Sequence, residues 1–349
     1  MTQTLNGAAL LQAWQDLLAS GAKLRQRDAA EKLGVSEAEL VAVMPGSCRL
    51  KSDWTGLLGR FHQLGEVMAL TRNDAAVHEK VGQYGELKGS AEVGLTLGVI
   101  DLRIFFSHWY CAFALSEPKG EGEQHSLQFF DRHGEAVHKV FQRAGSDAKA
   151  WQALVDEFTE FDGEALQFEP VVAKAGETPD ESIDVAGFQQ GWKDLTDTHQ
   201  FFGLTRRFEV SRRQALRFAP EGFTWRVGAD ALDRVLRTAA ERSLPIMVFV
   251  GNRGMIQIHS GPVQRIEPMG PWINVLDPGF NLHLRQDAIA EAWVVRKPTD
   301  DGIVSSLELL DGEGGIIATL FGERKPGQPE LEGWRTVLDE LPQELSHAA

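Results

Sequence analysis

An internal repeat constrains the fold of this chain more than any other feature of the sequence. Residues 126–141 align with residues 306–321 at an offset of 180, and five of the sixteen positions are identical. Shorter matching segments continue upstream at offsets of 175 to 181, so the alignment extends over more than 100 residues. A repeat of this length predicts two structurally similar halves. We place the N-terminal half at residues 1–175 and the C-terminal half at residues 176–349.

Each half begins with helix-like segments and continues with strand-like segments. Ser36 and Glu39 have the spacing of a capping box and predict a helix over 37–43. The other expected helices cover 8–20, the stretch 27–43, about 188–219 and about 330–346. Runs of β-branched and aromatic residues between turn residues predict strands. In the first half these are 65–72, 75–81, 92–98, 101–116, 125–131 and 135–142, and in the second half 246–250, 255–260, 272–276, 280–285, 289–297, 304–311 and 314–322. Helices followed by runs of antiparallel strands predict an α+β fold.

The composition excludes several classes of protein. The chain has 35 Lys and Arg against 50 Asp and Glu, a net charge of −15, and its nine Trp and 19 Phe need a buried core. Residues 27–40 resemble a DNA-binding helix-turn-helix. The second helix, however, would present Glu37 and Glu39 where phosphates and base edges require basic or amide side chains. We therefore expect no nucleic-acid partner.

The sequence favours a cytoplasmic protein that does not insert into a membrane. The N-terminus lacks a basic and apolar leader, and no window approaches the roughly 20 apolar residues of a membrane span. Cys48 and Cys111 match no metal or redox spacing, so we expect ordinary thiols in a reducing compartment. No dinucleotide-binding, Walker, nucleophile-elbow or zinc-protease motif is present.

The segment 192–207 combines a histidine with aromatic and basic residues. If this segment is helical, Leu195, Phe202 and Arg206 share a face with His199. Five arginines follow His199 within 18 residues of a strongly acidic chain. Neutral imidazole binds haem iron, aromatic rings cover a flat macrocycle, and guanidinium groups pair with carboxylates. The pattern favours a haem site; the alternative is a surface helix with a capping histidine.

Several longer motifs strengthen this hypothesis because they occur together and in order. They are Asp-Thr-His at 197–199, Asp-Leu-Arg-Ile-Phe at 101–105, Asn-Val-Leu-Asp-Pro at 274–278, Val-Val-Arg-Lys-Pro at 294–298 and Leu-Phe-Gly-Glu-Arg at 320–324. With these motifs the chain resembles the cytoplasmic haem-utilisation proteins of Gram-negative bacteria. This is the hemin-degrading factor family, which includes HemS, ChuS, ShuS, HmuS and PhuS. The resemblance covers roughly residues 8–340.

The resemblance implies a fold and a set of site residues. Each half would be a large antiparallel sheet with helices packed on one side, and one haem b would lie in a cleft between the halves. His199 would be the proximal iron ligand, and Arg103 and Phe105 would lie on the distal face, with Arg103 the catalytic residue if the protein is an enzyme. The residues implied at the propionates or the pocket edge are Arg212, Lys297 and Arg324.

Two functions follow from the resemblance and stay open at this point. The first is an intracellular haem carrier or store that takes haem from an inner-membrane importer and passes it to a downstream acceptor. The second is a haem-degrading enzyme, similar to haem oxygenase, that opens the tetrapyrrole. Since the chain has no flavin or nicotinamide motif, the enzyme would depend on a reductase partner for electrons. A regulator that uses residues 27–40 is disfavoured by the acidic second helix.

Overall fold

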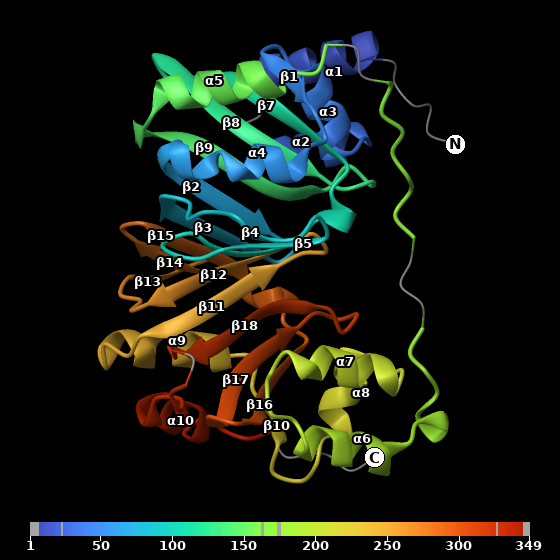
Figure 1. Ribbon diagram of the computed structural model, residues 1–349, viewed down its shortest axis with the longest axis vertical. Helices are drawn as coiled ribbons and strands as arrows, with labels where there is room; N and C mark the ends of the chain where they lie inside the picture. Colours follow the sequence, from blue (N-terminus) through green and yellow to red (C-terminus); the bar gives the residue numbers. More distant parts are fainter. Residues whose placement is uncertain (1–6, 22–23, 162–163, 173–175, 326, 345–349) are drawn as a thin grey trace. The chain divides into compact units, whose positions relative to one another are not determined.

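The chain forms two compact units that are each discontinuous in sequence. The computed structural model describes residues 7–21, 24–161, 164–172, 176–325 and 327–344 (Figure 1). Unit 1 comprises Met1–Arg72, Glu79–Val172 and Gly251–Gln257, and unit 2 comprises Asn73–His78, Ala173–Val250 and Ile258–Ala349. Each unit therefore contains a short segment from the other half of the sequence. The predicted boundary at residue 175 lies outside the described residues, and the two-domain division at that point stays a prediction.

The strands form two antiparallel sheets of nine strands, which confirms the predicted α+β class. In unit 1 the strands β1 (Ser47–Leu50), β7 (Cys111–Lys119), β8 (Gly122–Phe130), β9 (Ala136–Ser146) and β2 (Gly65–Arg72) are neighbours in that order, as are β6 (Asp101–Phe105), β5 (Val93–Thr96) and β4 (Lys88–Gly89). In unit 2 the orders are β10 (Thr224–Val227), β16 (Glu291–Thr299), β17 (Gly302–Leu310), β18 (Ile316–Gly322) and β11 (Ile246–Gly251), then β15 (Phe280–Arg285), β14 (Trp272–Asp277) and β13 (Ile266–Met269). Strands β3 (Ala76–Gly82) and β12 (Met255–Gly261) contribute residues to both units.

Ten α-helices lie in the described part of the chain. Unit 1 holds α1 (Gly7–Ala19), α2 (Gln26–Leu33), α3 (Glu37–Val43), α4 (Trp54–Gly59) and α5 (Ala148–Phe158). Unit 2 holds α6 (Val185–Lys193), α7 (Gln200–Arg207), α8 (Arg212–Arg217), α9 (Ala231–Glu241) and α10 (Glu332–Asp339). None of these helices is long and apolar enough to cross a membrane.

The predicted repeat is confirmed at the level of single hydrogen-bonded pairs. In unit 1 Cys111 pairs with Phe130, and in unit 2 the residues 180 positions later, Glu291 and Leu310, pair in the same way. The β8–β9 and β17–β18 ladders each shift register at one equivalent step, between Phe129 and Phe130 and between Leu309 and Leu310. The turns between these strands contain Gly134 and Gly314, both with φ of +75°, a conformation that favours glycine.

Helices pack on both faces of the sheet end formed by β1, β7 and β8, which differs from the one-sided arrangement that was expected. Successive residues of a strand point to opposite faces. Accordingly Phe113 packs with the core of α1, α2 and α3, whereas Ala112 and Ala114 pack with α4 and α5. Unit 2 repeats this layering, since Val295 packs with α6, α7 and α8 and Val294 packs with α9 and α10.

Several predicted elements are divided or missing. The single strand expected over 101–116 is two strands, β6 and β7, separated by a 3-10 turn over Phe106–His108. The indole of Trp109 donates to the carbonyl of Gly254 at 3.0 Å and fixes the chain at this turn. The helical stretch 27–43 breaks at Gly34, whose φ is +70°, and the stretch 188–219 is three helices. The last predicted helix ends at Asp339 as α10, and its final two predicted residues lie outside the described chain. Elements that the sequence did not predict are β1, β4, β10, β13, α4, α5 and α9.

Candidate functional site

His199 lies in the turn between α6 and α7, and its side chain is 89% exposed. One carboxylate oxygen of Asp197 accepts a hydrogen bond from the His199 backbone N–H at 2.7 Å and lies 2.6 Å from the ring Nδ1. Because the carboxylate accepts the proton of Nδ1, the lone pair is on Nε2, which has no partner among the described residues. Metal-ligating histidines have this arrangement, in which a carboxylate fixes the tautomer and the other nitrogen binds the metal.

The hydrogen bonds also fix the charge of the carboxylate. The backbone N–H of His199, its ring and the nearby Arg324 lower the pKa of Asp197. Asp197 is therefore ionised at neutral pH and remains an acceptor for the ring. The pair thus orients the ring so that Nε2 faces solvent.

The helix expected over 192–207 is interrupted, because α6 ends at Lys193 and α7 begins only at Gln200. Leu195 is buried in the apolar cluster beneath this turn and does not share a face with His199. Phe202 and Arg206, at three and seven positions after His199, remain on the exposed side of α7. The ring of Phe202 is 70% exposed, and the Arg206 guanidinium lies 5.8 Å from its centroid.

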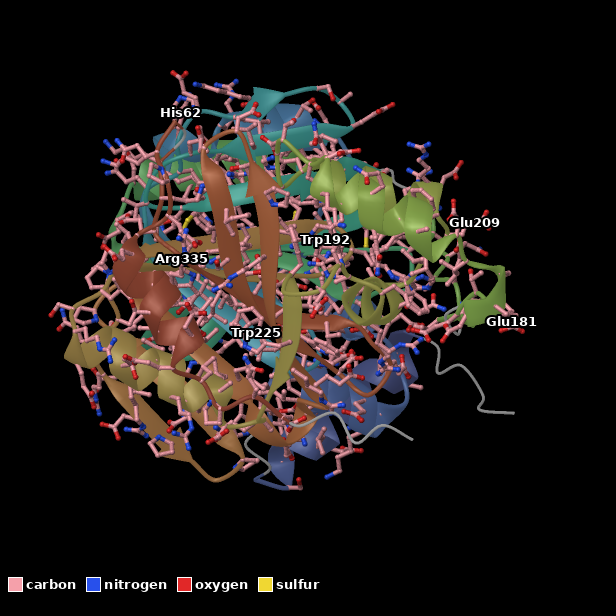
Figure 2. All side chains as sticks on the ribbon, turned by 90° about the horizontal axis from the view of Figure 1, so that it is seen from below. His62, Glu181, Trp192, Glu209, Trp225 and Arg335 are labelled. Carbon is pink, nitrogen blue, oxygen red and sulfur yellow. The ribbon has the colours of Figure 1, made fainter. Side chains whose placement is uncertain are left out.

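The helices that carry this turn rest on a packed aromatic layer. In Figure 2 Trp192 lies within the molecule, whereas Glu181 and Glu209 lie at its edge. The fully buried Trp192 ring meets the Phe201 ring edge-on at a centroid distance of 4.5 Å. Its indole N–H donates to the Arg296 carbonyl at 2.9 Å and so connects α6 to β16. The exposed histidine is thus presented from a rigid base.

Arg324, which follows β18, has a donor that the chain leaves unused. Its side chain is 23% exposed, and its closest carboxylate contact is Asp301 at 3.9 Å. The Nη1 atom is buried and has no hydrogen-bond partner among the described residues. Since buried donors are normally satisfied, this atom is suited to donate a hydrogen bond to a carboxylate or another acceptor of a ligand. Its electrostatic effect on Asp197 places it in the neighbourhood of His199.

Arg212 and Lys297, both predicted at the propionates, lie together around a buried carboxylate. Arg212 forms a fork with Glu308, in which Nε donates at 2.7 Å and Nη2 donates to the other oxygen. Lys297 donates to Glu308 at 3.0 Å. Both cations also lie 4.7 Å from the centroid of the Phe201 ring. Their contact with propionates stays a prediction, because in this structure an internal anion already pairs with them.

This cluster holds Lys297 and Glu308 away from water, while the Arg212 side chain remains 22% exposed. Burial lowers the pKa of Lys297 to about 8, against the opposing attraction of Glu308. Burial alone would raise the pKa of Glu308, but Arg212 and Lys297 outweigh it and lower that pKa to about 2. Glu308 is therefore charged throughout the physiological range, and the cluster has a net charge of +1 at neutral pH.

Arg103 and Phe105 lie in unit 1 on the partly exposed face of β6. Alternation along the strand puts Asp101, Arg103 and Phe105 on this face, while Leu102 and Ile104 are buried in the core. The Arg103 guanidinium donates to the carboxylate of Asp101 and to the carbonyl of Leu102. The two predicted residues are thus neighbours on one surface. Their assignment to the distal face of a haem stays a prediction.

Sequence reasoning missed three residues that shape this site, namely Asp197, Phe201 and Glu308. Asp197 belonged to a quoted motif, and its position two residues before the histidine was the available signal. Glu308 is a single acid within the apolar run Ser-Leu-Glu-Leu-Leu, a pattern that predicts either a strand edge or a buried ion pair. Phe201 gave no separate signal, since one buried aromatic residue per helix is ordinary.

The comparisons with known proteins agree with these motifs. The family model described as the haemin-degrading HemS.ChuX domain matches residues 34–158 and 209–341, so the turn with His199 falls between its two matches. The hemin transport protein HmuS of Yersinia pestis is 42% identical over 319 residues, which cover 90% of this chain and 92% of that protein. A holo structure of PhuS, a heme-binding protein from Pseudomonas aeruginosa, has a TM-score of 0.95 and 45% identity, covering 97% of this chain and 100% of that one. A structure of ChuS, described as an E. coli heme oxygenase, has a TM-score of 0.86 and 36% identity, with 95% and 99% covered.

Proposed function

The chain belongs to the HemS family of haemin-degrading domain proteins, and from this premise we propose that it binds one haem b through His199. The observation that carries the proposal is the Asp197–His199 pair, which presents an unpaired Nε2 to solvent. Haem supplies an iron that accepts an imidazole nitrogen and two carboxylates that require cations. The donors present in unit 2 fit both requirements.

The neighbours of His199 support a flat and anionic ligand over a bare metal ion. Phe202 offers an exposed ring three residues after His199, and Arg206 lies over that ring. Arg324 offers a buried and unpaired N–H. Among the described residues, no three His, Cys, Asp or Glu side chains converge as they would around a protein-bound metal ion. One imidazole is sufficient when a porphyrin supplies the other ligands.

Haem titration of single-residue variants tests the proposal. His199→Ala removes the iron ligand, so haem affinity is expected to fall by at least about tenfold, with a changed Soret band. Asp197→Asn keeps the ligand but removes the carboxylate that orients it, and a loss of roughly 10- to 100-fold is expected. His62, an exposed histidine of unit 1, provides the matched control, and His62→Ala should bind as wild type. Wild-type affinity and spectrum in His199→Ala would overturn the assignment.

We propose that the bound haem is cargo that is received and passed on in the cytoplasm. A single histidine on an exposed turn suits reversible binding, which transfer between an inner-membrane importer and a downstream acceptor requires. The free thiols Cys48 and Cys111 suit a reducing compartment. Transfer is measured directly by mixing the haem-loaded protein with a haem-free acceptor such as apomyoglobin and following the spectral change.

A second candidate, haem degradation with external electrons, is favoured by the Asp101–Arg103 pair. Burial raises the pKa of Asp101, although Arg103 opposes the shift. A carboxyl group of this kind beside a permanent cation can store and deliver a proton. Arg103→Ala should retain most haem binding but slow the conversion of haem by a reductase system with catalase present. Equal conversion by the variant and the wild type would exclude Arg103 from the reaction.

A further inference from the structure

We propose that Glu308 is a positioning residue for His199, and that it acts by holding Arg212 and Lys297 against the Phe201 ring, an arrangement we call the two-cation clamp. This inference rests on the proposed haem ligation by His199. Glu308 is the fully buried centre of the cluster and accepts hydrogen bonds from both cations. It has no exposed surface, so its effect on a ligand must pass through other side chains.

The clamp brings together helix α8 and the β16–β17 hairpin, which are far apart in sequence. Arg212 opens α8, Lys297 lies on β16, and Glu308 lies on the adjacent strand β17. Each cation lies 4.7 Å from the centre of the Phe201 ring. Cations at this distance are attracted by the aromatic face, and more strongly where water is excluded. Phe201 is only 2% exposed.

Phe201 connects the clamp to the histidine. It is the second residue of α7, and His199 occupies the N-cap position of the same helix. The ring also packs edge-on against Trp192 within the apolar cluster of α6, α7 and α8, which blocks its movement toward α6. The first turn of α7 is thereby fixed on two sides. The direction of the His199 ring depends on this turn, because among the described residues the ring itself has one hydrogen bond, from Nδ1 to Asp197, while the second bond to Asp197 comes from the His199 backbone N–H.

The carboxylate of Glu308 is needed to balance the charges of the two cations in the clamp. Without an anion, Arg212 and Lys297 would be two like charges at one buried ring, and burial already lowers the pKa of Lys297. Removal of the Glu308 charge is expected to drive the cations apart or to deprotonate Lys297. Either outcome weakens the cation–ring contacts and lets α7 move.

Unit 1 has a similar ion cluster, but among the described residues this cluster does not contact an aromatic ring next to a candidate iron ligand. Glu37 is buried there, with Arg72 and Lys139 each 2.6 Å from its oxygens. The residue that aligns with Phe201 at an offset of 175 is Gln26, which accepts a hydrogen bond from Lys139 at 2.8 Å. This cluster has an amide where unit 2 has an aromatic ring, and it carries no candidate ligand. Glu37→Gln is therefore the matched control for Glu308→Gln.

The test measures the His199 ring directly, with and without haem. In the haem-free protein, the ¹⁵N chemical shifts of the imidazole report the tautomer that Asp197 holds. Glu308→Gln should shift them toward a tautomer mixture and weaken haem binding by about tenfold. Glu37→Gln should leave both unchanged. Phe201→Leu keeps the ion cluster and an apolar side chain but removes the ring face, so it should reproduce the effect of Glu308→Gln.

The outcomes separate this inference from the proposed function. If Glu308→Gln folds and keeps wild-type ring shifts and affinity, the positioning role is wrong. If Glu308→Gln fails to fold, wild-type values in Phe201→Leu overturn it instead. If wild-type protein fails to ligate haem through His199, the proposed function is wrong, while the ring shifts of the haem-free variants still decide whether Glu308 positions the imidazole.

Discussion

Unit 1 and unit 2 place different charges at positions that the repeat aligns. Glu37 opens α3 in unit 1, and Arg212 opens α8 in unit 2, each directly after a serine that completes a capping box. A carboxylate at a helix N-terminus is favoured by the helix dipole, and a guanidinium is disfavoured. The arginine of unit 2 therefore gains nothing from its helix and is stabilised by Glu308. Such a locally unfavourable residue is a signal of function.

Charge also differs between the two units at aligned positions of the strands. Glu117 of β7 aligns with Lys297 of β16, and Gln128 of β8 aligns with Glu308 of β17, both at an offset of 180. In unit 1 the Gln26 amide donates to Glu117 at 2.9 Å and links it to the cluster. The same position of the fold thus holds an acidic side chain in one unit and a basic side chain in the other. The fold depends on the apolar pattern around the cluster, and the chemistry depends on a few polar positions.

The histidine itself is the sharpest difference between the units. The residue that aligns with His199 is Leu24, a partly buried side chain that packs against the core of α1, α2 and α3. Unit 1 therefore has an apolar contact where unit 2 has an exposed imidazole. One strong iron ligand is expected, although the fold is present twice.

The largest expected effect tests whether the two ion clusters are structurally equivalent. Glu37→Ala and Glu308→Ala each leave a buried lysine and a partly exposed arginine without their carboxylate, and each should lower the free energy of unfolding by about 3 kcal/mol. Hydrogen exchange in β9 and in β18 reports the two units separately, which a single unfolding curve does not. If one of the two substitutions leaves the hydrogen exchange of its own unit unchanged, the two ion clusters are not structurally equivalent.

A smaller effect, which depends on pH, should distinguish unit 1. Burial lowers the pKa of His138 from 6.5 to about 3, and its ring nitrogens lie 2.8 Å from the Thr71 hydroxyl and 2.6 Å from the Tyr84 hydroxyl. The unfolded chain binds this proton between pH 6.5 and 3 and the folded chain does not, so stability falls as the pH drops through this window. The loss should reach a few kcal/mol, at about 1.4 kcal/mol for each pKa unit.

The pH effect is measured as the exchange protection of β9 from pH 7 to pH 4, corrected for the intrinsic exchange rate. His138→Gln keeps a hydrogen-bonding side chain that does not titrate in this range, so its stability should depend less on pH. An identical pH slope in wild type and variant would assign the acid sensitivity to other groups.

Much of the fold could be predicted because the same pattern of strands occurs twice in the sequence. Residues 126–141 and 306–321 predicted strands that the structure contains as β8, β9, β17 and β18. Helix α5 was predictable but missed, although Asp147 caps it and Trp151, Leu154 and Phe158 follow at helical spacing. Strands β1 and β10 have only four residues each, too few for a periodic pattern.

The candidate site was predictable only in part. His199 was found from its motif and from the arginines that follow it. The ion cluster joins residues 11 to 96 positions apart, from a helix and two strands, so no local pattern reveals it. The interruption before α7 was also missed, because Leu195 and Phe202 have helical spacing although they belong to different structural elements.

The division of β12 between the units has a consequence for any attempt to express one half of the sequence alone. Met255 is fully buried in the unit 1 core, and Gln257 accepts a hydrogen bond from Thr71 at 2.8 Å. A chain that stops near residue 175 lacks both side chains and would leave a hole in its own interior. Unit 2 likewise takes Ala75 and Ala76 of its core from the first half of the sequence. Neither half of the sequence therefore encodes a complete core, and a fragment of either half should be less stable than the same unit in the whole chain.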